Sequence, residues 1–329
     1  MKLLFIFTGG TIGSTVNGDI ISTDNKKPYL ILEKYREIYG LDHEYDILQP
    51  YTELSENNTG ATIRKLIGTV LENLSKGYDG IIITHGTDTI QYSAAVLSYT
   101  VKTDIPICLV SSNYTIENPK ANGLVNLHCA VRFMETVGTA GVWVSYKNQN
   151  DIPRIHKGSR LLERQAFTDC IFSVMDTYYG SFDEDFNFRH NPEYKESPDS
   201  MDYFSPDILT EEADSILRIE PYLGMVYPKI EPKIKYILHG SYHSGTINTK
   251  SIFPSDFFAE SNRRGIKIFL TGTESGECYE STQAFKDLHL IPVNNLSPIS
   301  AYVKLWLCAA AGYDPEVILG KSLAGDIVP

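Results

Sequence analysis

Short apolar runs alternate along the chain with longer stretches in which apolar residues recur every three or four positions. The short runs predict β-strands over residues 2–8, 80–84, 105–110, 141–146, 215–220, 234–239 and 266–270. The longer stretches predict helices over residues 60–77, 122–137 and 298–311. Because strands that are apolar on both faces and separated by helices are typical of α/β proteins, the pattern predicts a doubly wound, mostly parallel sheet.

An acidic stretch that contains several prolines, residues 183–214, interrupts this rhythm and carries nine of the twelve net negative charges of the chain. It shows no clear periodicity, which is typical of a connection between domains. We therefore predict three parts. They are a larger N-terminal domain that carries the site (residues 1–190), an acidic linker (191–214) and a smaller C-terminal α/β domain (215–329).

Composition narrows the class of protein. The chain has 329 residues, 42% of them hydrophobic and 21% charged, which suits about two globular domains. No apolar run approaches the roughly 18 residues of a membrane-spanning helix, and the apolar N-terminus is interrupted too early for a signal peptide. No cluster of Lys and Arg favours a nucleic acid partner. The five scattered cysteines form no CxxC pair, which argues against a disulfide framework or a zinc site and predicts a cytoplasmic protein.

Candidate chemistry gathers where strands of the first domain are predicted to end. The polar clusters are residues 8–13 (TGGTIG), residues 84–89 (THGTDT) and, more loosely, residues 154–157 (RIHK). Ligands of open α/β sheets bind outside the carboxyl ends of the strands, so we expect the three clusters to converge. Gly9 and Gly10 permit a sharp turn that brings backbone N–H groups close to a ligand.

Several of these residues also have ordinary structural interpretations. The glycine spacing matches neither a phosphate loop nor the dinucleotide fingerprint, and the histidines lack metal-ligand spacing, so no cofactor or metal is predicted. Asp88 and Gln91 fit a helix-capping box. Thr11 is also compatible with a residue whose side chain stabilises a local turn. His85 is compatible with a hydrogen-bonded residue at a strand end, and Lys157 with a lysine exposed to solvent.

Together, the TGGTI and THGTDT motifs resemble the two signature motifs of the bacterial-type L-asparaginases. That family includes asparaginase/glutaminases and the amidase subunit of a tRNA-dependent amidotransferase. The resemblance extends over nearly the whole chain, through residues 113–127 and 294–307. It implies hydrolysis of the side-chain amide of asparagine to aspartate and ammonia by a threonine nucleophile, without cofactor or metal.

The resemblance also implies roles for individual residues. It makes Thr11 the nucleophile, places Thr87 and Asp88 in the second motif, and matches the family lysine to Lys157. A threonine hydroxyl needs a base, and a lysine serves only when its neutral form is populated. Thr87 would then relay the proton, and backbone N–H groups near Gly86 and Thr87 would face a developing oxyanion.

Substrate-binding residues follow from the same resemblance. Ser55 is expected to bind the substrate carboxylate, whereas Glu56 and Asp88 would face its ammonium. The family forms homo-oligomers in which a neighbour's C-terminal domain completes each pocket. Residues 240–246 resemble that loop. Thr246 is the first candidate for a residue that completes the neighbour's pocket, and Tyr242 is the second.

One departure from the family pattern leaves alternatives open. Many members carry a tyrosine on a mobile loop beyond the nucleophile, but residues 13–27 contain none. Tyr29 is the first candidate, and Asp19 or Asp24 occupies the rough equivalent region. A glutaminase or an amidotransferase-type amidase remains an alternative, since one methylene discriminates by only ~1–3 kcal/mol. A non-catalytic amino-acid-binding homologue is the other alternative.

Overall fold

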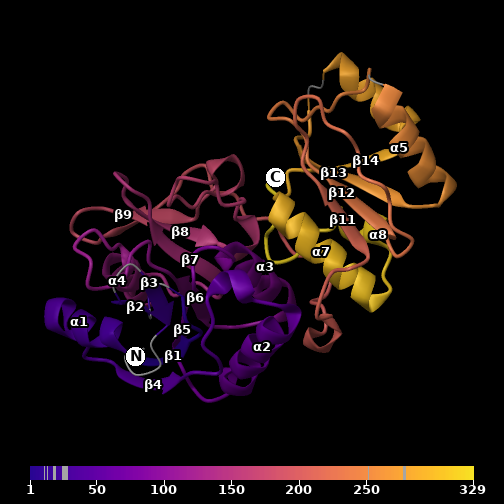
Figure 1. Cartoon of the computed structure of the whole chain (residues 1–329). Coiled ribbons are helices and arrows are strands. Elements are labelled where there is room, and N and C mark those ends of the chain that lie inside the picture. The colour runs from indigo at the N-terminus through magenta and orange to yellow at the C-terminus, as the bar shows by residue number, and fades with distance from the viewer. Residues whose placement is uncertain (11, 13, 18–19, 24–28, 251, 277–278) are drawn as a thin grey trace.

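The computed structural model describes residues 1–10, 12, 14–17, 20–23, 29–250, 252–276 and 279–329. These residues form two larger sheets and a hairpin of β2 (Ser14–Asn17) and β3 (Ile20–Thr23) (Figure 1). In spatial order, the large sheet contains β10 (Phe188–His190), β9 (Gly180–Phe182), β8 (Pro153–Lys157), β7 (Gly141–Lys147), β6 (Pro106–Val110), β5 (Gly80–Thr84), β1 (Lys2–Phe7) and β4 (Glu44–Leu48). The small sheet contains β11 (Ile216–Ile219), β12 (Tyr236–His239), β13 (Lys267–Thr273) and β14 (Leu290–Asn294).

The predicted fold class is confirmed. Strands β4, β1, β5, β6 and β7 run parallel, as do all four strands of the small sheet. The helices are α1 (Leu30–Tyr39), α2 (Gly60–Leu74), α3 (Ile90–Thr100), α4 (Gly123–Thr136), α5 (Ile252–Arg263), α6 (Ala284–Asp287), α7 (Pro298–Ala311) and α8 (Pro315–Ile318). Among the described residues, none of these helices is both long and apolar enough to cross a bilayer.

Strand β1 shows why the large sheet is covered on both faces. Leu4 and Ile6 pack in one core with residues of α2 and α3, whereas Leu3, Phe5 and Phe7 pack in a second core with residues of α1 and α4. Successive side chains of a strand point to opposite faces, so a strand that is apolar throughout requires a helical layer on each side. Figure 1 shows α1 and α4 on one side of the sheet and α2 and α3 on the other.

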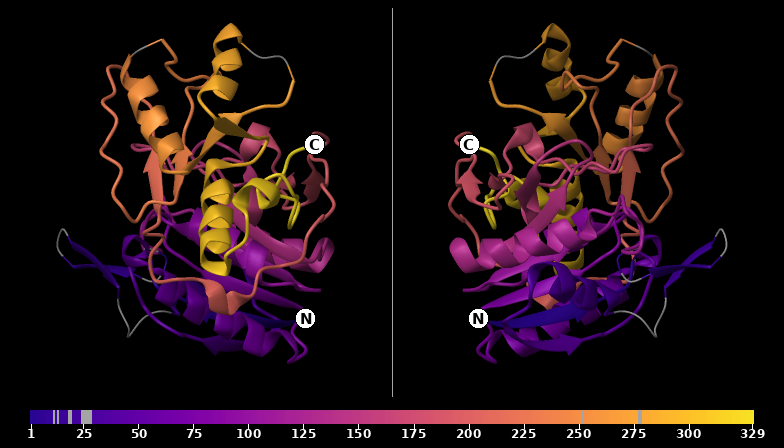
Figure 2. Two further views of the ribbon diagram at one scale, coloured as in Figure 1. Left: turned by 90° about the vertical axis from the view of Figure 1, so that its right-hand side faces the viewer. Right: turned by 90° about the vertical axis from the view of Figure 1, so that its left-hand side faces the viewer.

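Helix α7 packs between α3 of the large domain and the small sheet. Val303 lies in the core of the large domain, whereas Ala301 and Leu305 pack beneath the small sheet, whose other face is covered by Phe258 of α5. A helix that is apolar nearly all round must be buried in this way. The left view of Figure 2 shows α7, in yellow, beneath the small sheet and against the large domain.

The division of the chain at residues 190 and 214 stays a prediction. Residues 191–214 form loops and a short 3₁₀ turn, η5 (Pro206–Ile208), and β11 then begins the small sheet. The C-terminal tail returns to the large domain, where Arg160 Nε donates to Gly325 O over 2.7 Å. The C-terminal part of the chain therefore contacts the large domain through both α7 and the tail.

The chain reverses direction after β7. Strand β8 pairs antiparallel with β7, which places Pro153 opposite Lys147 and Lys157 opposite Trp143. The expectation that residues 154–157 lie together at the carboxyl edge of the sheet is therefore wrong for Lys157, whereas Arg154, opposite Tyr146, stays near that edge. They form a strand that leads from that edge back toward the amino edge.

Candidate active site

The ends of β1 and β5 meet at the carboxyl edge of the large sheet. Thr8 Oγ1 donates to Thr84 O over 2.7 Å. Gly9 and Gly10 have φ values of 104° and 79°, in the region that favours glycine. A Cβ atom on Gly10 would overlap the backbone of Gly86. The predicted sharp turn at Gly9 and Gly10 is present and brings the first two sequence clusters into contact, whereas the approach of its N–H groups to a ligand stays a prediction.

Ser55 holds the turn that follows β5. This buried residue begins a 3₁₀ turn, η2 (Ser55–Asn57), and its Oγ accepts from Asp88 N over 3.2 Å and lies 3.5 Å from Asp88 Oδ2. Its carbonyl accepts from Thr89 Oγ1 over 2.8 Å, and a Cβ on Gly86 would overlap its side chain. The structure thus brings Ser55, Gly86 and Asp88 together, and their roles toward a substrate stay predictions.

His85 fixes the next peptide of the turn. Its buried ring places Nδ1 2.8 Å from Gly86 O and Nε2 2.9 Å from Ser93 Oγ and 3.4 Å from Asn58 Nδ2. Burial lowers the pKa of His85, so the neutral ring donates from Nδ1 and accepts at Nε2. Because a trans peptide points its N–H away from its C=O, this contact also sets the direction of the Thr87 N–H.

Buried polar atoms without a hydrogen-bond partner gather near this edge. Within the described part of the chain they include Thr84 Oγ1 at the end of β5, Ser111 Oγ just after β6, Asn58 Oδ1 and Gln91 Oε1. An unpaired buried polar group costs about 1–3 kcal/mol, so such groups are expected where binding or proton transfer uses them.

Helix α3 does not begin with the predicted capping box. Its N-cap is Thr89, not Asp88, and Gln91 donates from Nε2 to the Asp88 carbonyl over 3.0 Å. The Asp88 side chain is exposed and directed instead toward Ser55. This frees the carboxylate of Asp88 from a structural role at the helix end.

Lys157 lies at the opposite edge of the sheet. Its Nζ lies 4.6 Å from the ring centroid of Trp143 and 3.2 Å from Glu196 Oε1. It lines a cavity of about 300 Å³ with residues that precede β6 and β7, including Thr103 and Ala140. The predicted convergence of Lys157 with Thr87 is wrong, because β8 runs away from the carboxyl edge and carries its lysine with it.

The proposed nucleophile and its loop lie mostly outside the described residues. This applies to Thr11, Asp19 and Asp24. Tyr29 is described: the residue is 39% exposed, and its ring contacts Phe7 edge-on, with ring centroids 5.2 Å apart. The chemical role of Thr11 therefore stays a prediction from the sequence.

For the two remaining candidates, Glu56 and Thr246, the structure gives no contact with this turn among the described residues. Glu56 is exposed in η2. Thr246 lies in the loop after β12, where its Oγ1 is 2.9 Å from Ser244 Oγ and its carbonyl accepts from Tyr242 N over 2.8 Å. That loop borders a cavity of about 740 Å³ at the carboxyl ends of β12, β13 and β14. A contribution of Thr246 to a neighbouring subunit stays a prediction.

His85 makes the hydrogen bonds at a strand end that its structural interpretation from the sequence describes. Sequence reasoning missed Asn58, which lies beside His85. It also missed Glu163 and Arg218, which carry no local signal and reach α3 only through the fold. In the described part of the chain, no cluster of three His, Cys, Asp or Glu side chains is arranged to hold a metal ion.

Comparisons with known proteins show similarity of sequence and of fold. The family profile described as "Asparaginase, N-terminal" matches residues 2–194. A glutamyl-tRNA(Gln) amidotransferase subunit from Haloquadratum walsbyi is 25% identical over 98% of this chain and 74% of its own length. Its namesake from Methanosarcina acetivorans is 32% identical, but the match covers only 55% of this chain and 43% of that relative.

Solved structures show the same fold over the whole chain. The thermostable L-asparaginase from Thermococcus kodakarensis superposes with a TM-score of 0.79 at 20% identity and covers 100% of both chains. L-asparaginase I from Vibrio cholerae gives a TM-score of 0.77 at 19% identity, covering 100% of this chain and 99% of the other.

Proposed function

Because the chain belongs to the asparaginase family, we propose that it hydrolyses the side-chain amide of L-asparagine to L-aspartate and ammonia. The observation that carries this proposal is the meeting of Ser55, Gly10 and residues 84–89 at one edge of the large sheet. All of them fall within the region that the family profile matches.

In the proposed reaction the Thr11 hydroxyl oxygen attacks the amide carbon of the substrate. The carbon–nitrogen bond then breaks, the nitrogen leaves as ammonia after taking a proton, and water hydrolyses the ester that remains. The Thr87 hydroxyl is the polar partner of the nucleophile. The Thr87 N–H, whose direction His85 sets through Gly86, is positioned to stabilise the developing oxyanion.

The same turn offers groups for both ends of an amino acid. Asp88 presents an exposed carboxylate for the α-ammonium, and the Ser55 hydroxyl beside it suits the α-carboxylate. Glu56 adds a second negative charge on the ammonium side. Lys157 takes no part in proton transfer in this proposal, since its ammonium lies over Trp143 at the other edge.

An ammonia-release assay with asparagine and glutamine tests the proposal through matched variants. Thr87→Ala should lower turnover by about 10²-fold or more, whereas Thr87→Ser keeps the hydroxyl and most of the activity. Lys157→Met should stay within about threefold of wild type, because the ion pair with Glu196 and the contact with the Trp143 ring that it loses both lie at the opposite edge of the sheet. Thermal unfolding confirms that each variant is folded. Wild-type turnover in Thr87→Ala, or a folded but inactive Lys157→Met, would overturn these assignments.

A non-catalytic amino-acid-binding protein is the second candidate. The position of Lys157 favours it, because the lysine expected to act as base lies away from the turn. Calorimetric titration with asparagine separates the two candidates: saturable heat without ammonia indicates binding alone.

The names of the curated relatives support a third candidate, an amidotransferase-type amidase. Ammonia release that prefers glutamine to asparagine would favour it.

We further propose that the protein is cytoplasmic and forms a homo-oligomer. Light scattering of the purified protein measures the mass of that oligomer.

A further inference from the structure

A polar network joins the small domain to the first turn of α3. Arg218 lies on β11, and its Nη1 is 2.8 Å from Glu163 Oε2 and 2.7 Å from the hydroxyl of Tyr92. The Tyr92 hydroxyl donates to Glu163 Oε2 over 2.9 Å, and Gln91 Nε2 donates to Glu163 Oε1 over 3.0 Å. Both oxygens of Glu163 are therefore engaged, by two residues of α3 and one of β11.

Gln91 carries the network into the candidate active site. Its side chain is 1% exposed, and Nε2 also donates to the Asp88 carbonyl over 3.0 Å. Turning the amide over would bring its oxygen against a carbonyl and a carboxylate, so Glu163 fixes its orientation. Asp88 is thus held on its N–H by Ser55 and on its C=O by Gln91.

Arg218 is well placed to stay charged in this position. Burial lowers the pKa of its guanidinium, but Tyr92, Glu163 and Glu220 raise it above its ordinary value. Its Nε and Nη2 donate to Glu220 Oε1 over 3.1 and 3.0 Å. Glu220 lies one residue beyond β11, so the guanidinium is fixed on the small domain while Nη1 reaches the large one.

We propose that Glu163 and Arg218 are positioning residues that hold the Thr87–Asp88 turn and couple its geometry to the position of the small domain. They act through Gln91 and touch no substrate. The catalytic consequence rests on the proposed asparagine hydrolysis, whereas the coupling itself does not.

Hydrogen exchange of the full-length protein tests the coupling without reference to activity. The reporters are the amides of Tyr92 and Ser93, which donate to Thr89 O in the first turn of α3. Glu163→Gln and Arg218→Met should each raise their exchange rate at least tenfold. The double variant should exceed the faster single variant by less than threefold, because the two side chains act as a unit.

The matched control is Arg189→Gln, which removes the exposed ion pair with Asp183 and should leave these rates unchanged. Wild-type exchange in both Glu163→Gln and Arg218→Met, or equal acceleration by Arg189→Gln, would overturn the coupling.

Kinetics then separate positioning from general stabilisation. With asparagine, kcat should fall at least tenfold in Arg218→Met while KM changes less than threefold. Arg218→Lys should recover most of kcat, since its ammonium also reaches Glu163. An equal loss in the methionine and lysine variants would contradict a positioning role. If the wild-type protein released no ammonia, the proposed function would fail, but the exchange rates would still decide the coupling.

Discussion

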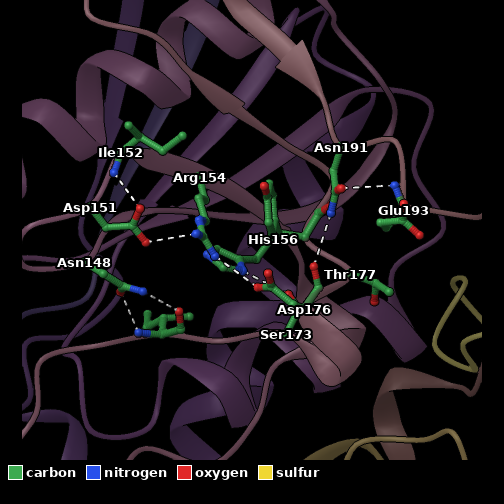
Figure 3. A network of polar contacts seen from close by, with 12 residues as sticks. Asn148, Asp151, Ile152, Arg154, His156, Ser173, Asp176, Thr177, Asn191 and Glu193 are labelled. Atoms are coloured by element: carbon green, nitrogen blue, oxygen red, sulfur yellow. Dashed lines mark hydrogen bonds and ion pairs between the residues drawn. The ribbon is translucent and has the colours of Figure 1, made fainter.

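We predict that protonation of the buried His156 makes the folded protein less stable at low pH. This residue takes no part in the proposed reaction. Its ring on β8 is 1% exposed, with Nδ1 2.9 Å from Ser173 Oγ and, within the described residues, no partner for Nε2. Burial, and then the charge of Arg154, lower the pKa of His156 to about 3. Figure 3 shows Arg154 beside this ring, directed toward the carboxylates of Asp151 and Asp176.

The size of the effect follows from the pKa difference. An imidazole titrates near 6.5 in an unfolded chain, so between about pH 6.5 and pH 3 the unfolded state binds a proton that the native state does not. The stability contributed by neutral His156 is complete above this window and is lost as the pH falls through it. At about 1.4 kcal/mol per pKa unit, the loss reaches about 5 kcal/mol over the whole window and about 2 kcal/mol by pH 5.

Guanidinium unfolding at about pH 7.5 and about pH 5 measures this loss. His156→Asn keeps a polar atom near Ser173 and cannot titrate. It is expected to be less stable than wild type at the higher pH, but to lose about 2 kcal/mol less on acidification. The matched control, His190→Asn, changes an exposed histidine and should keep the wild-type difference. An unchanged pH dependence in His156→Asn would refute the reasoning.

Two further variants test the packing around the site and the tail. Lys304→Met leaves buried Asp326 without its 2.5 Å ion pair and should cost about 3–5 kcal/mol of unfolding free energy in denaturant titrations, with a smaller cost when combined with Asp326→Asn. Gly10→Ala should abolish asparagine hydrolysis and lower the unfolding temperature, because its Cβ would overlap the backbone of Gly86. A Gly10→Ala protein with wild-type turnover would contradict the close approach of the two motifs.

The apolar pattern predicted most of the parallel core, because buried strands and one-sided helices leave a strong local signal. Helix α7 was predicted with its observed bounds, and β5 likewise. The hairpin of β2 and β3, the edge strands β4, β10 and β14, and the short strands β8 and β9 beside the edge were not predicted. Edge strands bury only part of their surface, so their sequences lack the continuous apolar runs of the central strands.

The contrast between Asp88 and Lys157 shows which part of a site can be read from sequence. Ser55 was expected beside Gly86 and Asp88 only from the resemblance to the family. Gly86 and Asp88 were expected at the carboxyl edge because their segment follows a predicted parallel strand, and such strand ends share one edge. Lys157 was placed by the same rule, but the rule fails once a strand reverses. The turn between Lys147 and Pro153 is short enough for a hairpin, and this length was the available signal.

Glu163 illustrates a limit of a different kind. Its partner Gln91 lies 72 residues before it in the sequence, and its partner Arg218 lies in the other domain. The contacts therefore cannot be predicted from any local spacing of residues. What can be reasoned in retrospect is the need for such a group. The buried Gln91 donates one N–H of its side-chain amide to a backbone carbonyl, so its second N–H also needs a hydrogen-bond acceptor. If that acceptor is a carboxylate, it needs a cation beside it in turn. The need for an acceptor and a cation near Gln91 follows from local chemistry, but only the fold determines which residues provide them.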